Sequence, residues 1–109
     1  MKRLILLLGL LPFGAMAAVE NLTADGDSAD VNCPNGWKLS VSVRGTIGSG
    51  TVVLQRTDEN SDVHNIESTS VTALPFDREV RCYGGDYNIN LSSSTSPDID
   101  IELIPFDPT

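Results

Sequence analysis

The sequence predicts one all-β domain, either a small antiparallel β-sandwich or a jelly-roll-like fold of about six to eight strands with one disulfide. Hydrophobic and polar residues alternate in several short segments, and Gly, Pro, Asn and Ser separate these segments. After residue 17, no window shows the 3.6-residue periodicity of an amphipathic helix. Short strands at close, regular spacing are typical of two packed antiparallel sheets.

Residues 1–17 are predicted to be a secretory signal peptide. Lys2 and Arg3 give a charged start, residues 4–11 form an apolar run, and residues 15–17 (Ala-Met-Ala) have the small residues of a cleavage site. The apolar run is too short for a transmembrane helix, which needs about 20 residues. The mature chain is therefore expected in the periplasm or outside the cell, without a membrane span.

The composition is acidic, and this limits the kind of partner. The chain has 7 Lys and Arg against 15 Asp and Glu, a net charge of −8. Loss of Lys2 and Arg3 with the signal peptide leaves 5 basic against 15 acidic residues, a net charge of −10. Such a charge repels a phosphate backbone, which disfavours nucleic acid as a partner. It favours a basic protein surface instead.

Cys33 and Cys82 are the only cysteines of the chain. In an exported protein they are expected to form one intramolecular disulfide, with intermolecular pairing or free thiols as the alternatives. The bridge would close a loop of about 50 residues and contribute about 4 kcal/mol on the chain-entropy model. Two Cys and one His are too few ligands for a zinc site, and no cofactor or other metal is expected.

Residues 18–32 are predicted to be an acidic, flexible leader. This segment is rich in aspartate and poor in bulky apolar residues. We expect it to end as an edge strand or a loop that the first cysteine ties down. The sandwich domain is therefore predicted to cover residues 33–109.

The strands of this domain follow from the alternation and from the turns between them. Leu39, Val41 and Val43 alternate with polar residues, and similar patterns recur along the chain. The glycine-rich stretches 45–50 and 84–86 are predicted to be hairpin turns. The predicted strands cover residues 39–43, 51–56, 63–67, 69–74, 79–83, 87–91 and 99–103.

Three carboxylates occupy alternate positions of the last predicted strand. Asp98, Asp100 and Glu102 would lie on one face, each about 6.6–6.8 Å from the next. That spacing suits a pair of acids around a glycosidic bond or a bound cation. An exposed strand face whose charges discourage aggregation is the favoured interpretation, because it requires no coincidence of spacing. No serine near His64, the single histidine, has the context of a catalytic nucleophile, so we expect no enzyme activity.

Three aromatic residues are the other candidates for a partner-binding surface. Trp37 follows a Pro-Asn-Gly turn and either packs on the disulfide at Cys33 or faces solvent. Together with Tyr83 and Tyr87 it would form a stacking surface for a sugar or a protein.

One part of the chain resembles small β-sandwich modules of phage tail and virion structural proteins. Residues 50–56 (Gly-Thr-Val-Val-Leu-Gln-Arg) are followed by a polar turn and a second strand at 63–66, as in those modules. Residues 87–91 with 92–97 resemble their closing hairpin. The resemblance covers about half of the mature chain and implies a β-sandwich fold. The signal peptide is a departure from it, because most virion modules are assembled in the cytoplasm.

These features predict an exported, non-catalytic domain that binds a protein partner, with a basic partner favoured by charge. One alternative is a phage, virion or appendage subunit that self-associates by adding an edge strand to its neighbours. The other is a small hydrolase that uses the carboxylates between Asp98 and Glu102.

Overall fold

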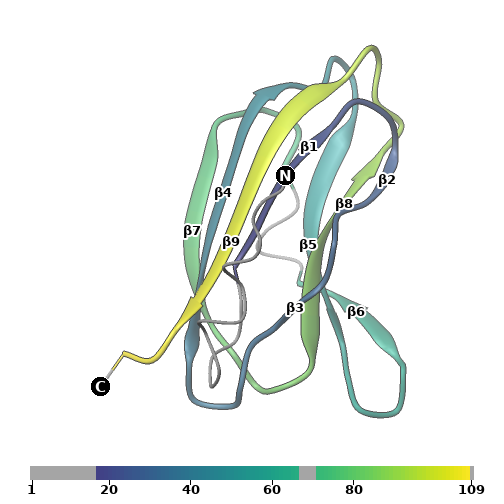
Figure 1. Cartoon of the computed structure of the whole chain (residues 1–109). Coiled ribbons are helices and arrows are strands. Elements are labelled where there is room, and N and C mark those ends of the chain that lie inside the picture. The colour runs from purple at the N-terminus through teal and green to yellow at the C-terminus, as the bar shows by residue number, and fades with distance from the viewer. Residues whose placement is uncertain (1–16, 67–70, 109) are drawn as a thin grey trace, which may run out of the picture.

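The computed structural model describes residues 17–66 and 71–108 and confirms the predicted fold class (Figure 1). The described chain contains strands and no helix, and its strands form two antiparallel sheets. The signal-peptide prediction falls outside the described residues except at Ala17. The strands are β1 (Ala18–Leu22), β2 (Gly26–Asp27), β3 (Val31–Asn32), β4 (Lys38–Thr46), β5 (Thr51–Thr57), β6 (Val63–Asn65), β7 (Phe76–Arg81), β8 (Asp86–Ser92) and β9 (Asp98–Phe106).

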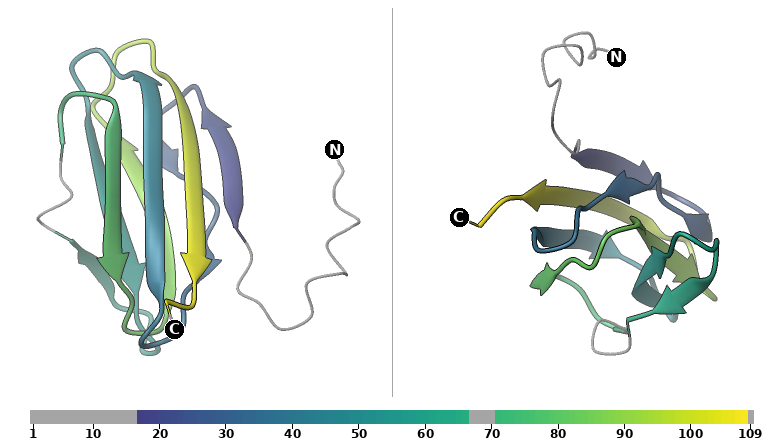
Figure 2. Two further views of the ribbon diagram at one scale, coloured as in Figure 1. Left: turned by 90° about the vertical axis from the view of Figure 1, so that its left-hand side faces the viewer. Right: turned by 90° about the horizontal axis from the view of Figure 1, so that it is seen from below.

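The two sheets pack face to face, as Figure 2 shows from the side and from below. The first, which we call the β9 sheet, has the order β1-β9-β4-β7. The second, the β8 sheet, has the order β2-β8-β5-β6, and β3 also pairs with β8. Four sets of pairings nest around the β5–β6 hairpin: β5 with β6, β4 with β7, β2 and β3 with β8, and β1 with β9. This nesting of strand pairs across two sheets is that of a jelly roll.

The glycine-rich stretches were expected to be hairpin turns, and that expectation is wrong. The first stretch covers the end of β4 and its connection to β5, and the second covers the end of the β7–β8 connection and the first residue of β8, so both mark crossings between the two sheets. A turn between two alternating segments has the same composition whether the second strand pairs with the first or crosses over. Only the long-range pairings of β4 with β9 and of β5 with β8 decide between the two.

Residues 18–32 form part of the sandwich, which corrects the prediction of a flexible leader. All five residues of β1 pair with β9, and Ala18 and Leu22 pack against the hydrophobic core. The sandwich therefore includes β1, β2 and β3, which all precede Cys33. The prediction was wrong because it relied on the low hydrophobicity of the segment. An edge strand buries only one face, and its pairing with the neighbouring strand orders its backbone.

The predicted strand at 69–74 is also wrong for those of its residues that the structure describes. Residues 69 and 70 lie outside the described part of the chain, and residues 71–74 form no strand. Val71 makes a single bridge to Val52 of β5, and the next strand, β7, begins at Phe76. The prediction placed that strand at 79–83 because its first half, Phe-Asp-Arg, is mostly charged.

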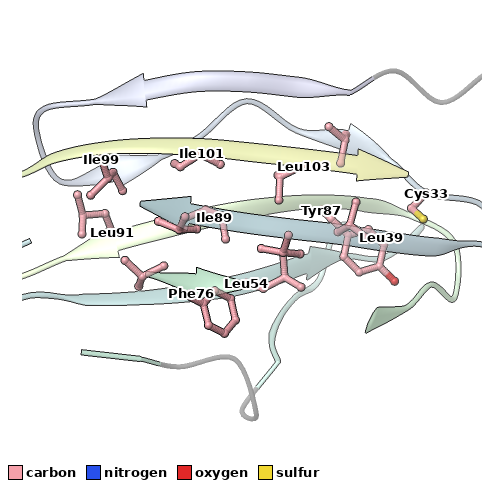
Figure 3. Close-up of a cluster of buried hydrophobic side chains, with 14 of the residues drawn as sticks. Cys33, Leu39, Leu54, Phe76, Tyr87, Ile89, Leu91, Ile99, Ile101 and Leu103 are labelled. Atoms are coloured by element: carbon pink, nitrogen blue, oxygen red, sulfur yellow. The ribbon is translucent and has the colours of Figure 1, made fainter. Parts of the chain in front are cut away.

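The core lies between the sheets and is filled by alternate residues of the long strands (Figure 3). The inward residues of β4 and β9 face those of β5 and β8, which is the alternation that the sequence predicted. The buried side chains labelled in Figure 3 are Cys33, Leu39, Leu54, Phe76, Tyr87, Ile89, Leu91, Ile99, Ile101 and Leu103.

Ser28 joins the short strands β2 and β3 to β8 at the point where the ladder is interrupted. Its backbone N–H donates to the carbonyl of Ile89 at 2.8 Å, and its Oγ accepts the N–H of Ile89, also at 2.8 Å. Ser28 is buried, so its hydroxyl takes the place of a ladder carbonyl that is missing there.

Ser28→Ala is expected to lower the free energy of unfolding by about 1–3 kcal/mol, because it leaves the buried N–H of Ile89 without an acceptor. Urea denaturation followed by fluorescence measures the loss. Ser40→Ala, on the outer face of β4, is the control and is expected to change stability by less than about 0.5 kcal/mol. Equal losses in the two variants would contradict this role of Ser28.

Asp58 organises the turn of the β5–β6 hairpin. Its Oδ1 accepts the backbone N–H groups of Asn60 (2.9 Å) and Asp62 (3.0 Å), and its Oδ2 lies 2.9 Å from Nε2 of His64. The hydrogen bond with His64, followed by the backbone N–H of Asp62, lowers the pKa of the Asp58 carboxyl below its usual value. The charged carboxylate is therefore the form that stabilises the turn.

This lowered pKa predicts an acid-sensitive hairpin. The contribution of Asp58 is complete above its unfolded pKa of about 3.9 and is lost as the pH falls from there through the lower folded value. Amide shifts of Asn60 and Asp62, followed by NMR between pH 6 and pH 2, should report this loss. Asp58→Asn should remove this step, and Glu59→Gln, whose parent side chain accepts none of these bonds, should keep it. An unchanged titration in Asp58→Asn would refute the assignment.

Candidate functional site

The outer face of the β9 sheet presents the three predicted carboxylates together. Along β9, Ile99, Ile101 and Leu103 are buried, and the residues between them face solvent. Asp98, Asp100 and Glu102 are those exposed residues, as their alternation predicts. They lie on a strand that is paired on both sides, with β1 and with β4, so the row has a rigid support.

The basic side chain in register with this row is paired with another carboxylate. Arg44 of β4 lies directly opposite Asp100 in the strand register. Its guanidinium instead binds Asp77 of β7, with Nη2 at 3.0 Å from Oδ1 and 2.9 Å from Oδ2. Asp77 also accepts the hydroxyl of Ser42 at 2.8 Å. The pairing with Asp77 leaves Asp100 without the cation that the register places beside it.

A neutral amide, rather than a cation, links two of the carboxylates. Asn21 of β1 donates Nδ2–H bonds to Asp98 Oδ1 at 2.9 Å and to Asp100 Oδ1 at 3.0 Å, and it also contacts the carbonyl of Ile99 at 3.0 Å. The amide orients both acids and adds no positive charge. The negative charge of the pair is therefore not compensated within the site.

The carboxylate of Glu102 has no hydrogen-bond or ion-pair partner among residues 17–66 and 71–108. It lies opposite Val19 of β1 on one side and Ser42 of β4 on the other. A hollow of about 170 Å³ opens here on the sheet surface. Its lining residues are Val19, Ser42, Arg44, Asp100, Ile101 and Glu102.

Apolar side chains border the acidic row. Val19 is 75% exposed, and Ile104, which follows Glu102 on the outer face of β9, is 36% exposed. The face therefore combines uncompensated carboxylates with exposed aliphatic groups. Val19 belongs to the segment predicted to be a leader, so the sequence analysis did not include it in the site.

The three aromatic candidates do not form one surface. Tyr87 is fully buried, and its hydroxyl accepts the backbone N–H of Tyr83 at 3.0 Å, so it cannot contact a partner in this fold. Trp37 packs partly against the core, and its carbonyl accepts the N–H of Cys82. Tyr83 is 61% exposed, with the guanidinium of Arg81 5.6 Å from its ring centre. Of these three residues, only Tyr83 presents an exposed aromatic ring.

The disulfide between Cys33 and Cys82 is present, as predicted. Both cysteines are fully buried, and the bridge ties the β3–β4 loop to the start of the β7–β8 connection. This end of the sandwich holds Lys38 and Phe106 in register, whereas Asp98 lies opposite Thr46 at the other end of the same strands. The disulfide therefore stabilises the fold at a distance from the carboxylates.

No group of three or more His, Cys, Asp or Glu side chains within the described ranges has an arrangement that could hold a metal ion. No helix among the described residues has the length and apolar character that a membrane crossing requires.

The fold and the site place this chain in the class of disulfide-bonded antiparallel jelly-roll domains with an acidic sheet face. No protein-family model, curated protein or solved structure gives a significant match to the chain.

Proposed function

We propose that this chain is an exported, non-catalytic binding domain whose outer β9-sheet face associates with a basic protein. One observation carries the proposal: Asp98, Asp100 and Glu102 form an exposed row with no salt bridge in the described part of the chain. The one cation in register with the row, Arg44, is neutralised by Asp77. A basic partner supplies the missing counter-charge.

Two further observations support export. The buried Cys33–Cys82 disulfide is typical of oxidising compartments outside the cytosol. The first strand begins at Ala18, so cleavage after Ala17 leaves the sandwich intact. We place the mature protein in the periplasm or the extracellular medium, with a net charge of −10 that attracts basic proteins over a distance of about 10 Å at moderate salt.

One of the two edges of the β9 sheet, strand β7, favours a binding domain over a structural subunit that assembles by strand addition at that edge. In the edge strand β7, Arg78 lies opposite the buried Val41, so a charge occupies the core side of the edge. Its guanidinium lies 5.5 Å from the ring centre of Phe76. Inward-pointing charges on edge strands are a known protection against pairing with another sheet.

The proposal is tested by affinity capture with the oxidised protein, expressed from the full chain and purified after export, at low and at high salt. Mass spectrometry of this product should show Ala18 as its first residue. The double variant Asp100→Asn/Glu102→Gln should bind the captured basic protein about 2- to 30-fold more weakly, because two exposed charge pairs are lost. The control Glu59→Gln/Asp62→Asn removes the same charge from the β5–β6 turn and should bind as the unmodified protein does.

The outcome separates the candidate functions. A basic protein that salt releases, and that the Asp100/Glu102 variant fails to retain, supports the proposal. Equal retention by both double variants overturns the acidic face as the binding site. Self-association that survives high salt overturns the proposal and supports a phage-like or appendage subunit, whose strand pairing depends little on charge.

A further inference from the structure

We propose that the hollow on the outer face of the β9 sheet seats one lysine side chain of the basic partner. This inference rests on the proposed function and adds to it the residue type that anchors the complex. The hollow lies where β1, β9 and β4 run side by side, with Val19 at one rim and Arg44 at another.

The hollow exists because two side chains of β4 lean towards β7. In the row that crosses the sheet, Ser42 stands between Glu102 and Asp77 and is shorter than either. Its Oγ donates to Asp77, and Arg44 also binds Asp77 through two contacts. The strip between β4 and β9 is therefore left uncovered beside Glu102.

The lining combines two kinds of surface. Asp100 and Glu102 carry carboxylates, and Ser42 carries a hydroxyl. The Ile101 side chain itself is buried in the core, so only its main chain reaches the hollow. Val19 forms an exposed aliphatic wall on the side of β1.

A lysine side chain has the chemistry that this lining requires. Its flexible aliphatic stem can lie along Val19, and its ammonium offers three donors to the oxygens of Asp100 and Glu102. The positive charge of Arg44 does not oppose the ammonium, because Asp77 compensates it. A carboxylate in the same place would face two like charges, and an apolar side chain would leave Glu102 without a partner.

The size of the hollow fits one such side chain. Its volume of about 170 Å³ is well above the roughly 10–15 Å³ that a single water needs by the same measure, so a long side chain can enter it. A single long side chain that fills a pocket on an otherwise flat surface is the usual form of an interface anchor.

The test uses NMR titration of the exported, oxidised protein with the peptide acetyl-Gly-Lys-Gly-amide at low salt. Amide shifts of residues 19, 42 and 100–102 should move with the peptide and stay unchanged with its Nε-acetyl-lysine analogue. Ser42→Gln fills the hollow and keeps every charge, and it should weaken binding about tenfold or more. Ser40→Gln makes the same change one outward position away, opposite Ile104, and should bind like the unmodified protein.

A second pair of variants keeps the test decisive if Ser42→Gln fails to fold. Glu102→Gln should weaken binding of the lysine peptide, whereas Glu79→Gln, which removes a carboxylate of the same sheet face paired with Lys38, should not. Equal binding of the arginine analogue would overturn the assignment to lysine. Unchanged binding in Ser42→Gln would overturn the hollow and leave the acidic face standing. Unchanged binding in Asp100→Asn/Glu102→Gln as well would overturn both.

Discussion

Replacing both Cys33 and Cys82 by alanine is expected to lower the free energy of unfolding by about 4 kcal/mol. The bridge joins residues 49 apart in sequence. Without it, the unfolded chain regains the conformational entropy that closing a loop of that length removes. For a domain with a total stability of about 5–15 kcal/mol this is a large fraction. Urea denaturation of the oxidised unmodified protein and of the cysteine-free variant, followed by Trp37 fluorescence, measures the difference.

A reductant provides the control for the disulfide. It should shift the denaturation midpoint of the unmodified protein towards that of the double variant and leave the variant unchanged. A double alanine variant that loses less than about 1 kcal/mol would show that the bridge contributes little beyond the core around it.

Gly45→Ala is expected to be the most damaging single substitution on the surface of the β9 sheet, with a loss of about 2–5 kcal/mol. Gly45 has a φ of +118° and lies opposite Ile99 in the β4–β9 ladder. A Cβ at this position would overlap the carbonyl oxygen of Asp98 and lie 3.0 Å from Cα of Ile99. The cost therefore combines backbone strain with displacement of the start of β9.

Gly36→Ala separates these two contributions. Gly36 has a φ of +91°, and a Cβ there would meet no atom within 4 Å. This variant should lose only the backbone part, about 1–2 kcal/mol, as measured by urea denaturation. In Gly45→Ala the amide shifts of Asp98 and Asp100 should also change, because the overlap falls on the strand that carries the carboxylates. Equal losses in the two variants would show that the contact with β9 is unimportant.

The prediction from sequence succeeded where a property depends on neighbours along the chain. The alternation of Ile99, Ile101 and Leu103 with acidic residues places one set in the core and the other in solvent for any sheet that buries one face. The pairing of Cys33 with Cys82 followed from their being the only cysteines. The row Asp98, Asp100 and Glu102 was therefore recognisable before any strand was paired.

The prediction failed where a residue takes its environment from a distant strand. Tyr87 alternates with Asn88 and has a polar end, so its local pattern does not distinguish a surface position from the core. Residues 18–22 contain few bulky apolar side chains, and they become a strand because β9 offers them an edge. Pairing between residues about 80 positions apart leaves no periodic signal in either segment.

The sequence by itself determined an acidic, all-β chain with one disulfide and one face of β9 lined by carboxylates, because composition and period-two alternation are local properties. The tertiary structure decided what those carboxylates face. The register brings Asn21, Val19 and Ser42 to the row, and Asp77 of β7 pairs with Arg44, the cation in register with it. The hollow and its missing counter-charge arise from four strands that meet only in the folded sheet, since strand order is set by non-local hydrogen bonding and packing.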